Sequence, residues 1–391
     1  MKRKIVLYGT GMEGEKFYCK WHEFYEIVFC IDQRHGRTFH GLPVYDISEV
    51  QTSLGDYLVV IAGKEPFRYE MENRLKKIGL LEYKNYIFSE CIGRKLAILY
   101  GNCHMVVLEK YLCSNPKFSD EYYIKIFLVN YKKYPSENDL QHCSLLIGED
   151  IRADGGHVSI YDLKSCVSQE CISIIIPNLF GTNIYFPQSV SKQGEEEQKK
   201  LIMKHFAKNA IDYDKVDPKQ MTAVRNMGCD DYNINFVFCN LPVDEIENKI
   251  EEEDLYEKDF IVEKFNQAIQ KLKDREEKCD IIISDYILEH YQERQLFYDP
   301  RHPVEDVVCE KGRRILRLLG IEVIEYDRIG RMIDEEEMFI YGCVKRALKL
   351  NFEQKYIRVS KNNTRSTFQK KPLCLREWIE DCLWWNKNLD K

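Results

Sequence analysis

A cysteine and a histidine directly follow an apolar run near residue 100. The run KLAILY (95–100) ends at Gly101, and Asn102, Cys103 and His104 come next, before a segment with helical apolar spacing. This order predicts a buried strand, a tight turn and a helix that begins near the cysteine. The backbone N–H groups and the dipole at a helix N-terminus favour a thiolate and lower the thiol pKa. The pattern indicates a nucleophile, although a cysteine that only fills the core would look the same.

A second reactive pair lies near residue 300. The segment LFYDPRHP (296–303) places Asp299 three residues before His302. The carboxylate can hold one imidazole nitrogen while the other faces the thiol, so that the three residues supply a nucleophile, a base and an orienting group. His104 is a candidate second base because it follows the cysteine. The alternative is a simple turn in which Pro303 opens a helix.

The elements that must position these residues alternate between strand and helix. Strands are expected at 95–100, 123–129, 143–148 and 171–177, helices at 104–113 and 158–166, and charged helical stretches at 195–210 and 244–278. Such alternation predicts an α/β fold with a parallel sheet. Ligands of open α/β sheets bind beyond the carboxyl ends of the strands, where the clusters GNCH, GEDIR and PNLFGTN fall. Glu149, Asp150 and Arg152 of GEDIR are candidates for lining this cleft, with a solvated loop as the alternative.

The first ninety residues form a separate α/β pattern. Gly9, Gly11 and Gly14 make a GxGxxG turn between a strand and a helix, and Asp32 ends the next strand. These glycines are candidates for nucleotide binding because they let backbone N–H groups approach a phosphate. Close packing of strand and helix is the alternative. The unit lacks a second nucleotide-binding half, which disfavours a nicotinamide cofactor. We place the domains at 1–92 and 93–391.

The composition narrows the class of protein. The chain has 391 residues, is 44% hydrophobic and 31% charged, and carries a net charge of −7, which is typical of a soluble globular protein and argues against nucleic-acid binding. No apolar run approaches the ~20 residues of a membrane helix, and no secretory signal is visible. The fifteen cysteines contain no CxxC pair, so we expect reduced thiols, no metal and a cytoplasmic location.

The region from 95 to 330 resembles the capsular polysaccharide acetyltransferase family typified by WcbI. The resemblance rests on the strand–GNC–helix pattern, on ILEHYQERQLFYDPRHP (287–303) and on YFPQ (185–188). That family is itself similar to SGNH hydrolases, in which a GDS serine and a DxxH pair form the triad. The resemblance implies that Cys103 takes the serine position and that Asp299 and His302 form the pair. His104 stands where the family usually has glutamine.

The same resemblance implies further site residues. An oxyanion hole would use Asn102 at the turn, with Gly148 and Asn178 as the nearest counterparts of the SGNH glycine and asparagine. Basic residues near His302 are candidates for the phosphates of CoA, because arginine binds phosphate through paired donors. They are Arg294, Arg301, Lys311, Arg313 and Arg314. The alternative is a basic helix face that balances the acidic runs. We expect Lys311 and Arg314 to share one exposed helix face.

The expected architecture is a small Rossmann-like parallel sheet, followed by a larger SGNH- or flavodoxin-like three-layer α/β domain with added helices. The N-terminal domain resembles those of bacterial sugar-modifying enzymes, which favours a nucleotide sugar, or no ligand, over NAD. The resemblance implies a cytoplasmic transferase for surface or capsular polysaccharide that moves an acetyl group from acetyl-CoA to a saccharide or nucleotide-sugar hydroxyl. An association with the periphery of membrane assembly machinery is an option.

Three alternatives stay open. The first is direct transfer with His302 as base and no acyl-cysteine. The second is an SGNH-like esterase or thioesterase with a cysteine nucleophile, since exclusion of water decides between transfer and hydrolysis. The third is a non-catalytic protein that binds sugar nucleotides or acts as a scaffold.

Overall fold

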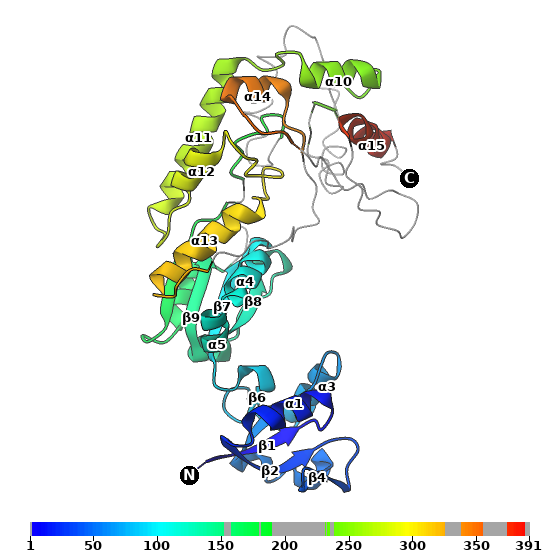
Figure 1. The fold of residues 1–391 in the computed structure, drawn as a ribbon, viewed down its shortest axis with the longest axis vertical. Helices are drawn as coiled ribbons and strands as arrows, with labels where there is room; N and C mark the ends of the chain where they lie inside the picture. Colours follow the sequence, from blue (N-terminus) through cyan, green and yellow to red (C-terminus); the bar gives the residue numbers. More distant parts are fainter. Residues whose placement is uncertain are drawn as a thin grey trace.

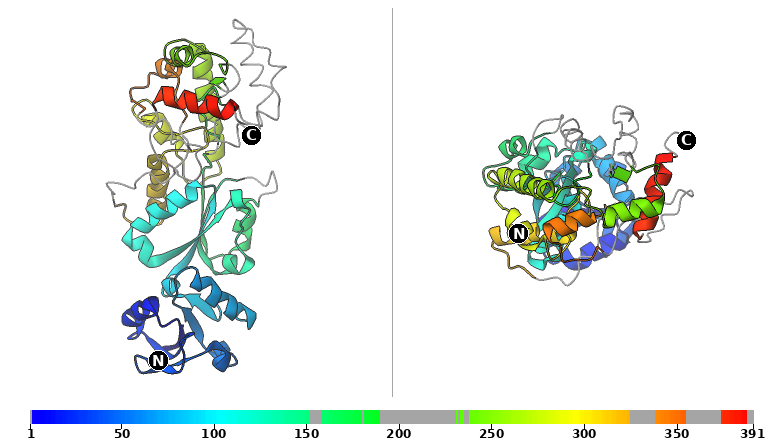
Figure 2. Two further views of the ribbon diagram at one scale, coloured as in Figure 1. Left: turned by 90° about the vertical axis from the view of Figure 1, so that its right-hand side faces the viewer. Right: turned by 90° about the horizontal axis from the view of Figure 1, so that it is seen from above.

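The computed structural model describes residues 2–151, 158–179, 181–189, 231, 233–234, 238–324, 338–354 and 374–387. Along the long axis, the N-terminal sheet lies at one end, a second sheet in the middle and a group of helices at the other end (Figures 1 and 2). Within these ranges no helix has both the length and the apolarity that crossing a bilayer requires. The helix expected at 195–210 lies outside the described residues.

The N-terminal sheet has the predicted α/β character. Its strand order is β3-β4-β2-β1-β5-β6, and all neighbours are parallel except β3 and β4. The strands are β1 (Arg3–Tyr8), β2 (Tyr25–Ile31), β3 (Arg37–Phe39), β4 (Leu42–Tyr45), β5 (Leu58–Ile61) and β6 (Tyr86–Phe88). Helix α1 (Met12–Trp21) packs on one face through Phe17, and α2 (Ile47–Val50) and α3 (Phe67–Lys77) pack on the other.

The second sheet is fully parallel, with the order β10-β9-β7-β8. Its strands are β7 (Lys95–Gly101), β8 (Tyr122–Leu128), β9 (Cys143–Glu149) and β10 (Ile172–Ile176). One face is covered by α4 (His104–Ser114), α5 (Pro116–Glu121) and α13 (Glu305–Leu318), the other by α6 (Glu137–His142) and α7 (Ile160–Cys166). The predicted α/β fold is confirmed. The carboxyl ends of β7 and β9 lie next to each other, so residues that follow these two strands can meet in one site.

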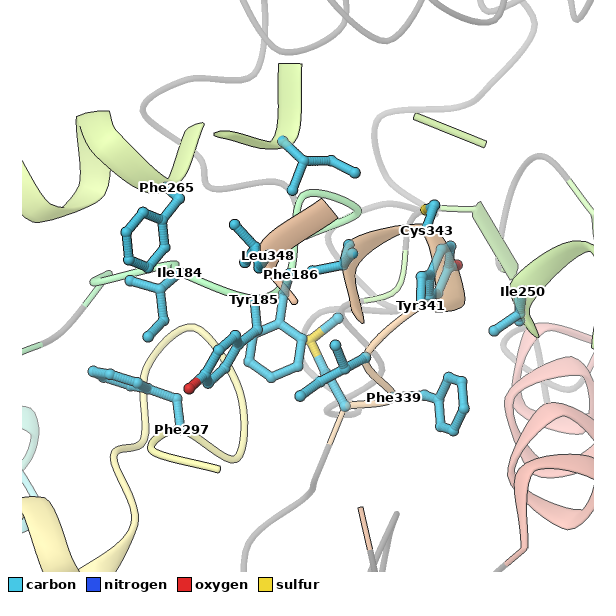
Figure 3. Close-up of a cluster of buried hydrophobic side chains, with 14 of the residues drawn as sticks. Ile184, Tyr185, Phe186, Ile250, Phe265, Phe297, Phe339, Tyr341, Cys343 and Leu348 are labelled. Carbon is cyan, nitrogen blue, oxygen red and sulfur yellow. The ribbon is translucent and has the colours of Figure 1, made fainter. Parts of the chain in front are cut away.

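The helices beyond this sheet enclose a large apolar cluster. They are α10 (Val243–Glu251), α11 (Lys258–Glu276), α12 (Ser284–His290), α14 (Gly342–Leu348) and α15 (Leu375–Lys387). The charged stretch 244–278 is thus two helices, separated by residues 252–257. Figure 3 shows Phe297 in this cluster together with Tyr185. The hydroxyl of Tyr185 donates a hydrogen bond to the carbonyl of Tyr291 at 2.8 Å, so YFPQ supports the chain that leads to Asp299.

The loop that carries Asp299 and His302 is closed by backbone hydrogen bonds. The N–H of Tyr298 donates to the carbonyl of His302 at 2.8 Å, and that of Val304 to the carbonyl of Leu296 at 2.9 Å. Val304 is the N-cap of α13, so the expectation that Pro303 opens this helix is wrong. Pro303 instead forms a bridge with Phe297, and the extended pairing delays the helix by two residues.

Candidate active site

The turn after β7 holds Cys103 at the N-cap of α4. The turn is built around Glu149, at the end of the neighbouring strand β9. The backbone N–H of Asn102 donates to Oε2 of Glu149 at 2.9 Å. A Cβ at Gly101 would come within 2.9 Å of the same oxygen, which explains the glycine. The close approach of Glu149 therefore shapes the turn that presents the thiol.

The loop before α13 holds His302 in one orientation. Nδ1 of its ring lies 2.8 Å from Oδ2 of Asp299. Oδ1 of Asp299 accepts hydrogen bonds from the backbone N–H groups of Arg301 and, at 2.9 Å, His302. Burial raises the pKa of the Asp299 carboxyl, but His302 and the other donors outweigh it, so the pKa is lowered. An ionised Asp299 thus binds Nδ1 of His302 and fixes the orientation of the ring.

The structure brings the predicted nucleophile and base together across almost two hundred residues of sequence. The Sγ of Cys103, one ring nitrogen of His104 and one of His302 all lie within 4.8 Å of one another. Burial of Cys103 favours the neutral thiol, but hydrogen bonds from the two imidazoles outweigh it and lower the thiol pKa to about 7. This arrangement supports a thiolate near neutral pH.

His104 has a different environment from His302. It is buried, and its Nε2 lies 3.0 Å from the carbonyl oxygen of Arg301. Because a carbonyl only accepts, Nε2 carries a hydrogen. Nδ1 faces Oε1 of Glu149 at 3.5 Å. Burial lowers the pKa of His104, but Cys103 and Glu149 outweigh it, so the pKa is raised. These contacts favour an imidazolium and disfavour the expected role of His104 as a second base.

Lys311 completes a buried charge cluster beneath the turn. Its Nζ lies 3.3 Å from Oε1 of Glu149 and donates to the carbonyl of Pro177 at 2.8 Å. Burial alone would raise the pKa of Glu149. The charge of Lys311, helped by His104 and the Asn102 N–H, outweighs burial and lowers this pKa to about 2. Burial also lowers the pKa of Lys311. The pair is ionised, because His104 and the Asn102 N–H also stabilise the Glu149 carboxylate.

Lys311 does not fit the expected role in binding CoA phosphates. It points into the interior because it lies on the same face of α13 as Val308 and Ile315, which pack on the sheet. Arg314 is bound to Asp285 at 2.7 Å and to Glu310 at 2.9 Å. The two residues therefore share no exposed face, and that expectation is corrected.

The remaining basic candidates are more accessible. Arg313 pairs with Glu310 at 3.3 Å. The Arg294 side chain is 46% exposed, with Asp306 at 3.9 Å. The Arg301 side chain is 32% exposed, and its guanidinium lies 3.6 Å from Asp299. Among the predicted phosphate ligands, Arg301 is thus placed directly beside the catalytic candidates.

The structure joins two of the three oxyanion candidates. Nδ2 of Asn102 donates to Oδ1 of Asn178 at 3.1 Å. Gly148 lies inside the sheet, opposite Tyr100 on β7 and Ile175 on β10. Its lack of a side chain makes room for Ile160, because a Cβ there would come within 2.1 Å of that side chain. We therefore do not retain Gly148 as an oxyanion donor.

Sequence reasoning missed two supporting residues. Arg275 on α11 donates to the carbonyl of Asn178 at 2.9 Å and supports the oxyanion segment. It belongs to a highly charged helix whose pattern shows no sign of such a contact. Glu149 was a candidate only for lining the cleft, together with Asp150 and Arg152; its position at the end of the strand next to β7 was the available signal. Arg152 lies outside the described residues.

The site also has the composition of a metal site. In the described part of the chain, the thiol of Cys103 and the imidazoles of His104 and His302 are close enough to share an ion. Thiolate and imidazole are the donors that zinc prefers. The sequence predicted no metal, and each imidazole already has one nitrogen engaged, by Asp299 and by the Arg301 carbonyl.

Comparisons with known proteins find related families for two parts of the chain. Residues 230–323 match the profile of the family described as polysaccharide biosynthesis enzyme WcbI, and residues 1–86 match that described as C2185-like, N-terminal. A solved structure of WcbI is 17% identical, with a TM-score of 0.52; the alignment covers 75% of this chain and 90% of that one. It is described as a native protein without a disulfide bond between CoA and a cysteine. No curated protein matches the chain. The predicted resemblance to the WcbI family is thus confirmed for residues 230–323, and the solved structure shows a similar fold.

Proposed function

We propose that this WcbI-like chain is a polysaccharide biosynthesis enzyme that transfers an acetyl group from acetyl-CoA to a sugar hydroxyl. The observation that carries the proposal is the proximity of Sγ of Cys103 to ring nitrogens of His104 and His302, all within 4.8 Å. The description of the solved WcbI structure, which mentions CoA and a cysteine together, supports a CoA donor. Such a donor favours the cytoplasm as the place of reaction.

In the first step the thiolate of Cys103 attacks the thioester carbonyl of acetyl-CoA. A bond forms between Sγ and the acetyl carbon, and the bond from that carbon to the CoA sulfur breaks. The imidazolium of His302, held by Asp299 at 2.8 Å, gives its proton to the departing CoA thiolate. The exchange of one thioester for another is nearly isoenergetic, which suits a cysteine better than a serine.

The tetrahedral intermediate needs donors at its oxyanion. The backbone N–H groups of Cys103 and His104, at the start of α4, are the first candidates, because those of Met105 and Val106 already donate to the carbonyls of Asn102 and Cys103 at 3.0 Å. The Asn102 side chain, positioned by Asn178, is the second candidate. The backbone N–H of Asn102 is already bound to Glu149 and is not used. Loss of one such donor typically costs about 3 kcal/mol of barrier.

In the second step the sugar hydroxyl attacks the acetyl group on Cys103. Nε2 of His302, now neutral, takes the hydroxyl proton while the new ester bond forms and the Cys103 thiolate leaves. His104 stays protonated between Glu149 and the Arg301 carbonyl and stabilises the thiolate in both steps. We assign Arg294 to the phosphates of CoA, because its side chain is 46% exposed and the pantetheine arm separates the phosphates from the thioester. Arg301, 3.6 Å from Asp299, lies at the reacting end and is not retained for this role.

The test is release of free CoA from acetyl-CoA in the presence of a panel of saccharides and nucleotide sugars. We expect repeated turnover that depends on one acceptor, is lost in Cys103→Ser, and in His302→Gln stops after at most one CoA per enzyme. Cys166→Ser is the matched control, because that cysteine is exposed and outside the site. Release without any acceptor indicates a thioesterase. Acceptor-dependent transfer that survives in Cys103→Ser indicates direct transfer with His302 as base, and no turnover at all contradicts an enzyme.

A further inference from the structure

The N-terminal domain contains a cavity of about 510 Å³ that is separate from the cysteine site. Gly9, Asp32 and Ala62, which follow β1, β2 and β5, contribute to its lining. In the sheet, β1 lies between β2 and β5, and the chain first continues to one side of β1 and then crosses to the other. In open α/β sheets this reversal leaves a crevice beyond the carboxyl ends of the strands, and ligands bind there.

Two glycines of the predicted GxGxxG turn are required by the fold itself. Gly9 has a φ of +108°, and a Cβ there would come within 2.4 Å of the carbonyl oxygen of Ala62. A Cβ at Gly14 would come within 2.1 Å of the carbonyl oxygen of Gly9. These two positions therefore have a packing reason and say nothing about a ligand.

Gly11 has no such reason. It lines the cavity, its φ of −85° suits any residue, and a Cβ there would meet nothing within 4 Å. A glycine at this place leaves open space directly over the backbone at the start of α1. The first N–H groups of that helix are oriented toward an anion that would occupy this space. The open space is what a phosphate needs to reach the backbone.

The cavity also offers an apolar surface at its rim. Met12 and Phe67 line it, yet they are 62% and 66% exposed. Large apolar side chains that line a cavity but stay exposed fit a flat, partly apolar group such as a nucleobase, which stacks on them. Asp32 is held by the N–H and hydroxyl of Thr10 at 2.8 and 2.7 Å, which fixes its carboxylate as an acceptor for a ribose hydroxyl.

The charges of the lining limit the number of phosphates. The cationic residues are Arg34, Lys64 and Arg74, and the anionic residues are Glu13, Asp32 and Glu70. Lys64 lies 3.5 Å from Glu13, and Arg74 lies 2.8 Å from Glu70. With balanced charges, the lining has no cationic surplus for a triphosphate. Neutral backbone donors together with Lys64, whose side chain is 63% exposed, suit the two charges of a diphosphate diester.

We propose that this cavity is a binding site for the nucleoside diphosphate part of a sugar nucleotide. Gly11 and the start of α1 receive the diphosphate, Asp32 the ribose, and Phe67 with Met12 the base. The proposal rests on the N-terminal domain alone and does not depend on the reaction at Cys103.

Calorimetry on the full chain tests it, with UDP, GDP, ADP and NAD as probes. We expect at least one diphosphate to bind and Gly11→Val to weaken it tenfold or more. Gly55→Val is the matched control, since a Cβ at Gly55 also meets nothing within 4 Å and Gly55 lies outside the cavity. If Gly11→Val lowers the melting temperature, the affinity of Phe67→Ala decides instead. That side chain is exposed, so its removal should leave the fold intact.

Four results overturn the proposal: no binding of any diphosphate, the same dissociation constant in wild type and in the deciding variant, tighter binding of NAD than of all three diphosphates, or displacement of the nucleotide by CoA. The last result would place the nucleotide at the acyl site. The Cys103→Ser protein keeps its nucleotide affinity if the two sites are independent, whereas its acetyl transfer is lost if the proposed function is right. Failure of one proposal is therefore distinguishable from failure of the other.

Discussion

Nζ of Lys311 lies 3.3 Å from Oε1 of Glu149, and both side chains are at most 1% exposed. The pair connects α13, which follows the loop of His302, to the end of β9. Through the N–H of Asn102, Glu149 also holds the turn that presents Cys103. One buried ion pair thus links the two segments that carry the proposed nucleophile and base.

The first prediction concerns this ion pair. Lys311→Met leaves Glu149 buried without its cation, and breaking a buried pair from one side typically costs about 3–5 kcal/mol of unfolding free energy. Arg317→Ala is the control on the same helix; that side chain is 59% exposed, 3.6 Å from Glu310. An exposed pair contributes up to about 1 kcal/mol. Urea denaturation measures both, and equal losses would contradict the assigned role of Lys311.

The second prediction concerns the reactivity of Cys103. Because its thiol pKa is lowered to about 7, iodoacetamide should modify it at neutral pH with a half-maximal rate near pH 7. Cys113 is the comparison. The residue as a whole is exposed, but partial burial of its sulfur raises the pKa of the thiol. Mass spectrometry of the labelled peptides gives both rates. A Cys103 that stays unlabelled in the native protein, with full activity in Cys103→Ser, would rule out the nucleophile.

The third prediction concerns the cause of that low pKa. Hydrogen bonds from His104 and His302 lower it against the effect of burial, so either His104→Gln or His302→Gln should move the alkylation midpoint of Cys103 to higher pH. Glu149→Gln should shift it in the same direction, because the carboxylate keeps His104 protonated. His142→Gln is the control, as that residue lies on α6 with its Nδ1 bound to Asn138. An unchanged midpoint in all three variants would contradict the electrostatic account.

The fourth prediction separates the two histidines. His302, oriented by Asp299, takes the acceptor proton in the proposed reaction, whereas His104 is held as an imidazolium between the Arg301 carbonyl and Glu149. With acetyl-CoA and acceptor, the His302→Gln protein should accumulate acetyl-Cys103 when assayed at a pH high enough to form the thiolate. The His104→Gln protein should still turn over under the same conditions. Intact-protein mass spectrometry detects the adduct, and the reverse pattern would exchange the two roles.

The fifth prediction concerns metals. Zinc should inhibit reversibly and protect Cys103 from alkylation, because a thiolate and two imidazole nitrogens lie within 4.8 Å. Magnesium, which prefers oxygen ligands, should have no such effect. A chelator should restore the zinc-treated enzyme and leave the untreated one unchanged. Loss of activity on chelation alone would instead make the ion part of the mechanism.

The amino-acid sequence determined the features that depend on neighbours along the chain. The apolar runs predicted the central strands of the first sheet and all four strands of the second, since a parallel strand buried on both faces needs continuous apolar residues. The short edge strands β3 and β6 were not predicted. The spacing of Asp299 and His302 predicted their contact, because three residues in a turn bring a carboxylate to an imidazole. Cys103 was identifiable because the strand, the glycine and the helix start are adjacent in sequence.

Only the tertiary structure decided which polar side chains work together. Lys311 reads as part of a basic surface until the sheet covers its face of α13, and burial then makes it the partner of Glu149. Gly148 reads as an oxyanion residue at the end of a strand, but it lies inside the sheet, where the packing of Ile160 requires a glycine. His104 follows the nucleophile in sequence, yet the Arg301 carbonyl, 197 residues away, determines where its proton lies. Such roles depend on long-range contacts, which local sequence patterns do not encode.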